Sequence, residues 1–367
     1  MLIFFLVLII VAYILQQWSL NNALKGISYE YTFTKQLVEP EEQIELISTV
    51  TNHSSRFVPF VELEEKFPVK VNLLQEGVNL RMDLMRNVSL ASSVYLMPKS
   101  LLERRTLISF SQRGTYAFRG AKLSGGDFLG LSEKIESFPS FKEVVVYPKA
   151  VSLNQVDQML GGFLGDVSVK RFMMEDPILT VGSREYTGRE PLKQISWKQS
   201  ARRNRLMVKQ YDYTSDPVVS VLLDINVSNN VKSEVNFHLI EQCFSITRTV
   251  CQFLEQKGIA YDFISNASTT NFLHRQNYLE KGLGKAHFRK TLEILGRSSV
   301  VATEPFFTTL KTLCQKNENN QSVIIITPFR DVEKQRFTQV LMKRDGTFTI
   351  IYGEEFDDFS NRTETNQ

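Results

Sequence analysis

The chain has few cysteines, and this excludes a fold held together by disulfides. It has three in 367 residues. Cys243 and Cys251 are eight residues apart. If they share a helix, a rise of about 1.5 Å per residue puts them beyond bridging distance. Cys314 stands alone, so the sequence favours reduced thiols that face the cytosol.

Motifs that organise nucleophilic or hydrolytic chemistry are missing as well. No Gly-x-Ser-x-Gly, His-Glu-x-x-His or Cys-x-x-Cys pattern exists to arrange the four histidines. The run Gly-Leu-Gly-Lys at 282–285 is half of a phosphate-binding loop. It lacks the first glycine and the Ser or Thr after the lysine, and it is typical of a turn. The sequence therefore predicts no catalytic residues and no enzyme.

The sequence also lacks an excess of charge of one sign. The 43 basic and 40 acidic residues leave a formal net charge of +3, which excludes a global field that draws the molecule to nucleic acid. One local cluster stands beside Trp197: Lys198, Arg202, Arg203, Arg205 and Lys209. It could follow a phosphate backbone, but the alternation at 206–211 is typical of a strand. We therefore favour a packed clamp beside the α/β region and predict no nucleic-acid partner.

One long apolar run is present at the start of the chain. The first fifteen residues carry no charge, and the run continues through Gln-Gln-Trp to residue 20, a helix of about 30 Å that would span hydrocarbon. The basic start and cleavage site of a signal peptide are missing. We predict that residues 1–20 are a single transmembrane anchor in the cell membrane, in contact with lipid; a buried core helix is the alternative. Lys25 and Lys35 follow the run, which favours cytoplasmic soluble domains.

Two regions with different hydrophobic patterns follow the predicted anchor. Short alternating runs separated by Pro, Gly and polar turns predict an all-β immunoglobulin-like sandwich over residues 21–150. After Pro217, continuous apolar strands alternate with helical spacing, which predicts a largely parallel sheet covered by helices within residues 151–356. The polar residues 357–367 are expected to be a disordered tail. The predicted fold class is multi-domain: a transmembrane helix, a β-sandwich and an α/β domain of Rossmann type.

Three short oxygen-bearing side chains follow the first strand of the α/β region at alternate positions: Asp224, Asn226 and Ser228. Ligands of open α/β sheets bind beyond the carboxyl ends of strands, and such oxygens could hold Mg²⁺. The spacing resembles the Asp-x-Ser-x-Ser metal-ion-dependent adhesion site of the von Willebrand factor A fold. No acidic residue directly follows Thr327, and Asp331 is displaced. The alternative is that Asp224 caps its turn by bonding to backbone.

A longer set of motifs carries a resemblance to a family. The motifs are RGTYAFRGAKLSGGDFLGL at 113–131, VVVYPK at 144–149, REYTGREPLKQISWKQSARRNRLMVKQY at 184–211 and a strand that ends at Asp224. Their order resembles the bacterial domain-of-unknown-function-58 family. The matching signature residues are Arg184, Glu185, Tyr186, Ile195, Trp197, Lys198, Ser200, Ala201, Arg202, Leu206 and Val208. Two acidic parts of the signature are replaced here, by the segment 189–191 and by Ser196.

The resemblance implies a membrane-anchored β domain followed by a von Willebrand factor A-like domain. It also implies a non-enzymatic adaptor that partners AAA+ ATPases of the MoxR group in maturation or assembly of other proteins. The predicted interaction residues are Arg184, Glu185, Tyr186, Trp197, Lys198, Ser200 and Arg202. Two alternatives stay open. One is a metal-dependent hydrolase or nuclease centred on Asp224, with Asp262, Asp331 or Glu333 as second ligand; the other is an envelope-surface adhesion-type protein.

Overall fold

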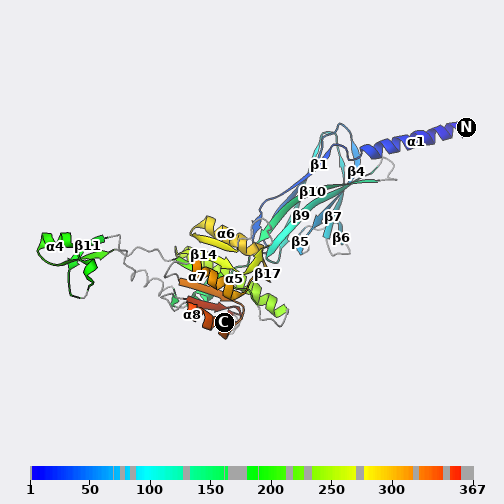
Figure 1. Ribbon diagram of the computed structural model, residues 1–367. Coiled ribbons are helices and arrows are strands. Elements are labelled where there is room, and N and C mark those ends of the chain that lie inside the picture. Colours follow the sequence, from blue (N-terminus) through cyan, green and yellow to red (C-terminus); the bar gives the residue numbers. More distant parts are fainter. Residues whose placement is uncertain are drawn as a thin grey trace. The chain divides into compact units, whose positions relative to one another are not determined.

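The computed structural model describes residues 2–68, 70–74, 79–82, 88–126, 133–160, 162–163, 180–188, 190–211, 218–226, 234–269, 277–316, 322–341 and 348–356. The chain divides into two compact units, Met1–Lys149 and Ala150–Gln367 (Figure 1). The predicted tail at 357–367 and the predicted metal ligand Ser228 lie outside the described residues.

Unit 1 consists of a first helix, α1 (Leu2–Asn22), and two sheets. The four-stranded sheet has the order β1 (Ile27–Phe33), β3 (Ile44–Asn52), β8 (Leu101–Phe110) and β5 (Val71–Leu73). The six-stranded sheet has the order β2 (Leu37–Val38), β10 (Glu133–Val146), β9 (Gly114–Gly126), β4 (Val58–Phe67), β7 (Val88–Leu96) and β6 (Asn79–Met82). Neighbouring strands pair antiparallel, except that β2 runs parallel to β10.

One hydrophobic core joins the two sheets of unit 1. Strand β3 alternates buried and half-buried residues along its whole length, as a strand with one face on a core does. Its Leu46 and Val50 belong to the same buried cluster as Leu63 and Phe67 of β4, from the other sheet. The two sheets therefore pack face to face as a β-sandwich.

The predicted transmembrane anchor at residues 1–20 is wrong. Helix α1 forms there, but among the described residues no helix combines the length and apolar character needed to cross a membrane. The apolar part before Gln16 covers only about 22 Å at 1.5 Å per residue, against a hydrocarbon core of roughly 30 Å. The polar end bonds within the helix, where Asn22 Nδ2 donates to Trp18 O at 2.8 Å. The first part of the predicted fold class, the single-pass location and the lipid contact are corrected accordingly.

Unit 2 contains a five-stranded sheet with the order β16 (Tyr278–Gly282), β14 (Ala260–Ser265), β13 (Val218–Leu223), β18 (Ser322–Thr327) and β19 (Phe348–Tyr352). Four of these strands are parallel, and the edge strand β16 runs antiparallel to β14. Two small sheets pair β15 (Ala267–Thr269) with β17 (Ser298–Ala302), and β11 (Thr180–Glu185) with β12 (Met207–Tyr211). The helices in the described part of unit 2 include α2 (Leu153–Leu160), α4 (Trp197–Arg203), α5 (Glu234–Gln256), α6 (Lys285–Arg297), α7 (Phe306–Lys316) and α8 (Val332–Leu341), with a 3-10 turn at Leu192–Gln194.

Helices cover both faces of the five-stranded sheet. Val221 of β13 lies in a buried cluster with Phe244 of α5. The next residue, Leu222, belongs to a second cluster with Phe306 and Leu310 of α7. Strands buried on both faces are apolar at most positions, which explains the nearly continuous apolar runs seen in the sequence. Because the central strands are parallel, their carboxyl ends meet at one edge, and the candidate site lies there.

Candidate functional site at the strand ends of unit 2

Three polar residues converge where three adjacent parallel strands end. In the sheet, Leu223 of β13 lies beside Ser265 of β14 and Ile326 of β18. The residue after each of these is polar and at most 2% exposed: Asp224, Asn266 and Thr327. The sheet register therefore brings these side chains together, as expected at the carboxyl ends of parallel strands.

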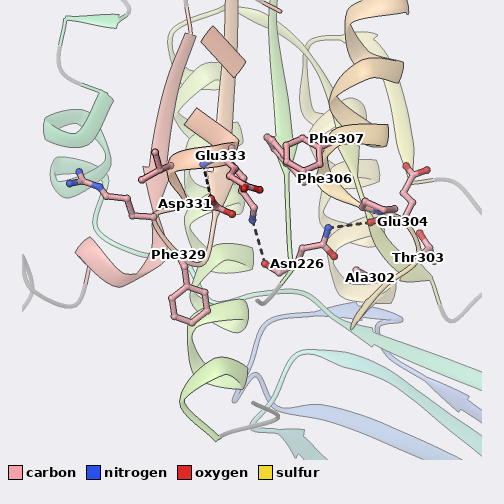
Figure 2. A pocket seen from close by; sticks show the side chains of 13 residues that line it. Asn226, Ala302, Thr303, Glu304, Phe306, Phe307, Phe329, Asp331 and Glu333 are labelled. Atoms are coloured by element: carbon pink, nitrogen blue, oxygen red, sulfur yellow. Dashed lines mark hydrogen bonds between the residues drawn. The ribbon is translucent and has the colours of Figure 1, made fainter. Parts of the chain in front are cut away.

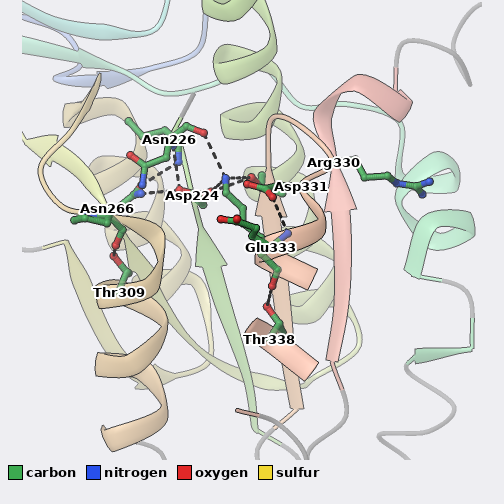
Figure 3. A network of polar contacts seen from close by, with 12 residues as sticks. Asp224, Asn226, Asn266, Thr309, Arg330, Asp331, Glu333 and Thr338 are labelled. Atoms are coloured by element: carbon green, nitrogen blue, oxygen red, sulfur yellow. Dashed lines mark hydrogen bonds and ion pairs between the residues drawn. The ribbon is translucent and has the colours of Figure 1, made fainter. Parts of the chain in front are cut away.

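The Asp224 carboxylate is the centre of this polar network (Figure 3). Its Oδ1 accepts hydrogen bonds from the backbone N–H of Asn226 at 3.0 Å and from Asn266 Nδ2 at 2.7 Å. Its Oδ2 accepts from Thr327 Oγ1 at 2.9 Å and from Lys334 Nζ at 2.5 Å. A carboxylate has about four acceptor positions. The fully buried Asp224 is therefore saturated with donors.

Lys334 supplies the positive charge of the network from the first turn of α8. Besides Asp224, its Nζ donates to Thr327 Oγ1 at 3.1 Å and to the carbonyl oxygen of Asn226 at 3.4 Å. The Lys334 side chain is 13% exposed. Its ammonium group also lies 5.4 Å from the centre of the Phe306 ring. The ion pair is thus enclosed, and its two charges neutralise each other away from water.

Asn266 connects the network to the segment that precedes α7. Its Oδ1 accepts from the backbone N–H of Ile225 at 2.9 Å, and its Nδ2 lies 3.4 Å from the carbonyl oxygen of Glu304. Its carbonyl oxygen accepts from the backbone N–H and the hydroxyl of Thr303 at 2.8 and 3.0 Å. The side-chain Nδ2 of Asn226 donates to the same Glu304 carbonyl at 3.3 Å. These bonds fix the loop after β13 against the start of α7.

Two of the three predicted magnesium ligands, Asp224 and Asn226, use their polar groups in hydrogen bonds within the protein. Asn226 contributes its backbone N–H to Asp224 and its side-chain amide nitrogen to Glu304. The ammonium group of Lys334 lies 2.5 Å from Asp224 Oδ2. Over the described part of the chain, no group of three or more His, Cys, Asp or Glu side chains is placed to hold a metal ion. The alternative prediction is that Asp224 caps its turn by bonding to backbone, and the hydrogen bond from the Asn226 N–H to Asp224 is of this kind.

A pocket of about 940 Å³ opens beside this network, between the starts of α7 and α8 (Figure 2). Its walls combine carboxylates, phenyl rings and two basic side chains. The lining residues are Asn226, Ala302, Thr303, Glu304, Pro305, Phe306, Phe307, Phe329, Arg330, Asp331, Val332, Glu333 and Lys334. The pocket is therefore both apolar and acidic.

The charged groups around the pocket are held by local contacts. Asp331 Oδ1 accepts from the backbone N–H of Glu333 at 2.8 Å, which caps the start of α8. Glu304 Oε1 accepts from Thr309 Oγ1 at 2.9 Å at the start of α7. Arg330 pairs with Glu355 at 2.7 Å. The carboxylates of Asp331 and Glu304 lie at the amino ends of α8 and α7, where the helix dipole favours negative charge.

The candidates for a second catalytic ligand are not gathered around Asp224. Asp262 lies on β14 in register with Ser220, well before the carboxyl end of the strand. Asp331 and Glu333 line the pocket, and the four groups that hydrogen-bond to the Asp224 carboxylate are all donors. A hydrolytic site needs a positioned base or metal next to the reacting group. The described geometry around Asp224 provides a cationic lysine in its place.

The predicted signature residues form a local module around the β11–β12 hairpin. Arg184 pairs with Glu190 at 2.5 Å, and Arg205 pairs with Glu185 at 2.8 Å. The backbone N–H of Tyr186 donates to Leu206 O at 2.9 Å. A hydrogen bond from the Thr187 hydroxyl and the Arg184 guanidinium lower the pKa of Glu190 to about 2. Ion pairs and turn contacts thus hold the first part of the signature.

Hydrogen bonds of Ser200 hold the second part of the signature together. Its Oγ accepts from the backbone N–H of Met207 at 2.8 Å and donates to Ser196 O at 2.9 Å. Ile195, Met207 and Val208 of the same module are buried. Trp197, in contrast, is 66% exposed, and Lys198 and Arg202 are exposed too. The expectation that Trp197 is a packed clamp is therefore not met.

Sequence reasoning missed Asn266 and Lys334 as members of the site. Asn266 had a usable signal, because it directly follows a strand that is apolar enough to be buried. The sequence signal for Lys334 is weaker. This lysine is a cation in the first turn of a helix, where the helix dipole disfavours positive charge. Its partner lies 110 residues away in the chain, and no local pattern could identify it.

Comparison with known proteins gives distant relations. No family model matches the chain. Over 197 residues the chain is 23% identical to the uncharacterized protein YeaD of Bacillus subtilis, a match that covers 53% of this chain and 45% of that protein. The chain thus spans less than half the length of that relative.

Among solved structures, the CARDB domain of the PF1109 protein from Pyrococcus furiosus is 14% identical over 33% of this chain and 91% of its own, with a TM-score of 0.21. A cohesin module from a Clostridium perfringens family 33 glycoside hydrolase is 12% identical over 33% of this chain and 96% of its own, with a TM-score of 0.24. Scores this low carry no argument. Neither comparison supports the predicted likeness to the von Willebrand factor A fold.

Proposed function

We propose that the chain is a non-enzymatic interaction protein that binds another protein at the strand-end pocket of unit 2. The observation that carries this proposal is the pocket of about 940 Å³, which has phenyl and carboxylate walls beside a carboxylate saturated with donors. A concave site with apolar walls and a few placed polar groups suits binding. Asp224 has no free acceptor position with which to take a substrate proton.

The charges of the pocket define the chemistry of the partner. Glu304, Asp331 and Glu333 contribute three carboxylates. Both basic groups of the lining have an anionic partner in the protein: Lys334 pairs with the buried Asp224, and Arg330 pairs with Glu355 at the surface. The pocket therefore presents negative charge, which complements a Lys or Arg side chain of a partner.

The apolar side chains of the pocket define a second property of the partner. Val332 is 58% exposed and Phe307 is 36% exposed, and both line the pocket. Phenyl rings accept the aliphatic stem of a basic side chain and attract its cationic group. A basic and apolar segment of a protein partner is the occupant that this combination favours.

The partner we propose is an AAA+ ATPase of the MoxR group, with a role in maturation or assembly of other proteins. Support comes from the sequence: the order of motifs across residues 113–224 resembles the domain-of-unknown-function-58 family, whose members are associated with such ATPases. The similarity to the uncharacterized Bacillus subtilis protein adds a sequence relation without a function.

The test is affinity purification of the tagged full-length protein from its own cells, with Mg²⁺ and ATP present. Glu333→Lys reverses one charge in the pocket. Glu280→Lys makes the same change at an exposed position of the edge strand β16. We expect an AAA+ ATPase with the wild type and with Glu280→Lys, and its loss with Glu333→Lys. No ATPase with the wild type, or equal retention by both variants, contradicts the proposal.

A further inference from the structure

The ammonium group of Lys334 lies where oxygens of three segments meet at these strand ends. Its Nζ contacts three oxygens from separate segments: Asp224 Oδ2 at 2.5 Å, Thr327 Oγ1 at 3.1 Å and Asn226 O at 3.4 Å. We propose that the Lys334 ammonium group is the built-in cation of this site. It replaces a divalent metal and makes the strand-end face independent of metal.

The donor geometry of an ammonium group suits these contacts. A lysine ammonium has three N–H donors and no acceptor, and here three oxygen acceptors surround it. A carboxylate, a hydroxyl and a backbone carbonyl are also the oxygen types that hard divalent cations accept. The same oxygens therefore form a cation position, and the protein fills it from its own chain.

Charge neutrality explains why the lysine is the better occupant. Asp224 is 0% exposed, and a buried carboxylate requires a compensating positive charge. One ammonium group neutralises one carboxylate. A divalent ion at the same oxygens would leave an uncompensated positive charge in the buried site and would have to lose most of its water shell, which Mg²⁺ does reluctantly.

The position of Lys334 in α8 provides an independent argument. A cation in the first turn of a helix opposes the helix dipole, so this position needs a compensating anion, which Asp224 supplies at 2.5 Å. The pair thereby ties the start of α8 to the ends of β13 and β18. Asp331 and Glu333, which line the pocket, flank this anchored turn.

The test is calorimetric titration of the purified full-length protein with MnCl₂, together with thermal melts in EDTA and in Mn²⁺. Wild-type protein is expected to show no saturable heat and the same melting temperature in both solutions. Lys334→Ala is expected to melt at a lower temperature and to bind Mn²⁺ at least tenfold more tightly than the wild type. Mn²⁺ is expected to raise the melting temperature of this variant.

Two matched variants separate the cation position from general loosening of the fold. Lys334→Met keeps most of the side-chain volume without a charge, so it is expected to melt lower and to gain no Mn²⁺ binding. Asp224→Asn combined with Lys334→Ala removes the anionic ligand, so it is expected to lose the Mn²⁺ binding of the single variant. If Lys334→Ala does not fold in EDTA, refolding in Mn²⁺ is expected to recover it.

Three results overturn the inference. The first is saturable Mn²⁺ binding by the wild type that Asp224→Asn abolishes, since the site would then be a metal site. The second is a Lys334→Ala protein that neither binds Mn²⁺ nor is recovered by it. The third is equal Mn²⁺ binding by Lys334→Ala and Lys334→Met. The titration needs no partner protein, so its outcome is independent of the affinity purification that tests the proposed function.

Discussion

Arg104 of β8 forms an ion pair with Glu65 of β4 inside the β-sandwich of unit 1. The two strands belong to different sheets, and the Glu65 side chain is only 3% exposed. Tyr29 of β1 donates its hydroxyl to Glu65 Oε1 at 2.8 Å. Burial and then the charge of Glu65 raise the pKa of Tyr29 above its ordinary value. A polar contact between the sheets is thus embedded in an otherwise apolar core.

Glu65→Ala is expected to destabilise the protein by about 3 kcal/mol, because removal of one partner leaves the other charge buried and uncompensated. Urea unfolding of the full-length protein measures this change. Replacing Glu65 by Leu and Arg104 by Met together is expected to recover most of the loss, since it removes both charges. A loss below about 1 kcal/mol for Glu65→Ala would mean that the pair behaves like a surface ion pair.

Gly120→Ala is expected to be strongly destabilising. Gly120 has a φ of +92°, and a Cβ there would lie 2.1 Å from Phe138 O and 2.8 Å from Ser140 N, at the bulge between β9 and β10. The matched control is Gly188→Ala. Gly188 has the same φ, but its Cβ would meet no atom within 4 Å.

The control should lose about 1 kcal/mol from backbone strain alone. Gly120→Ala should lose clearly more, because the backbone of β10 has to move. Thermal melts of the two variants compare these costs directly. Equal melting temperatures would show that the backbone of β10 moves at the bulge with little cost in free energy.

The stability of unit 2 is expected to fall as the pH is lowered through about 6.5, and His287 is one cause. Burial lowers the pKa of His287 from its ordinary 6.5, with Lys290 as a further cause and Glu255 opposing. The folded protein thus resists a proton that the unfolded chain accepts, and the free energy of unfolding decreases with falling pH.

His287→Gln isolates this contribution. The ring of His287 packs edge-on against Tyr261 at 4.7 Å, so the variant also loses some packing at every pH. The informative quantity is the slope of unfolding free energy against pH between about 7.5 and 5.5, which should be shallower in the variant. Identical slopes for both proteins would exclude His287 as a source of the acid sensitivity.

Trp197→Ala is expected to change the free energy of unfolding by no more than about 0.5 kcal/mol, as for other exposed positions. Ile195→Ala in the same module is expected to cost about 2–5 kcal/mol, since Ile195 is 4% exposed. Circular dichroism melts of both variants test the difference. A large loss for Trp197→Ala would show that its ring is covered in the full protein.

The strands of unit 2 could be predicted from the sequence because burial on both faces leaves a continuous apolar run. Asp224 could be placed at a strand end for the same reason, since the run stops there. The partners of Asp224 could not be found in this way. Asn266 and Thr327 reach it through the order of strands in the sheet, and Lys334 reaches it through the packing of α8.

Two of the corrected predictions, the membrane anchor and the packed Trp197, have a common physical origin. The anchor prediction at residues 1–20 extended the apolar run through Gln16 into a polar end, which overestimated the apolar length. The burial of Trp197 was inferred from its residue type. In both cases a local property of the sequence was used in place of the surroundings of the side chain, which only the fold determines.

The 110 residues that separate Asp224 from Lys334 have a consequence for biosynthesis. The carboxylate, the asparagine, the threonine and the lysine enter the site in chain order, and the lysine comes last. A nascent or truncated chain that ends before α8 holds an uncompensated buried carboxylate and has no complete pocket wall. The proposed binding face therefore forms only after α8 has been synthesised, so a partner that binds this face would select chains that extend at least through α8.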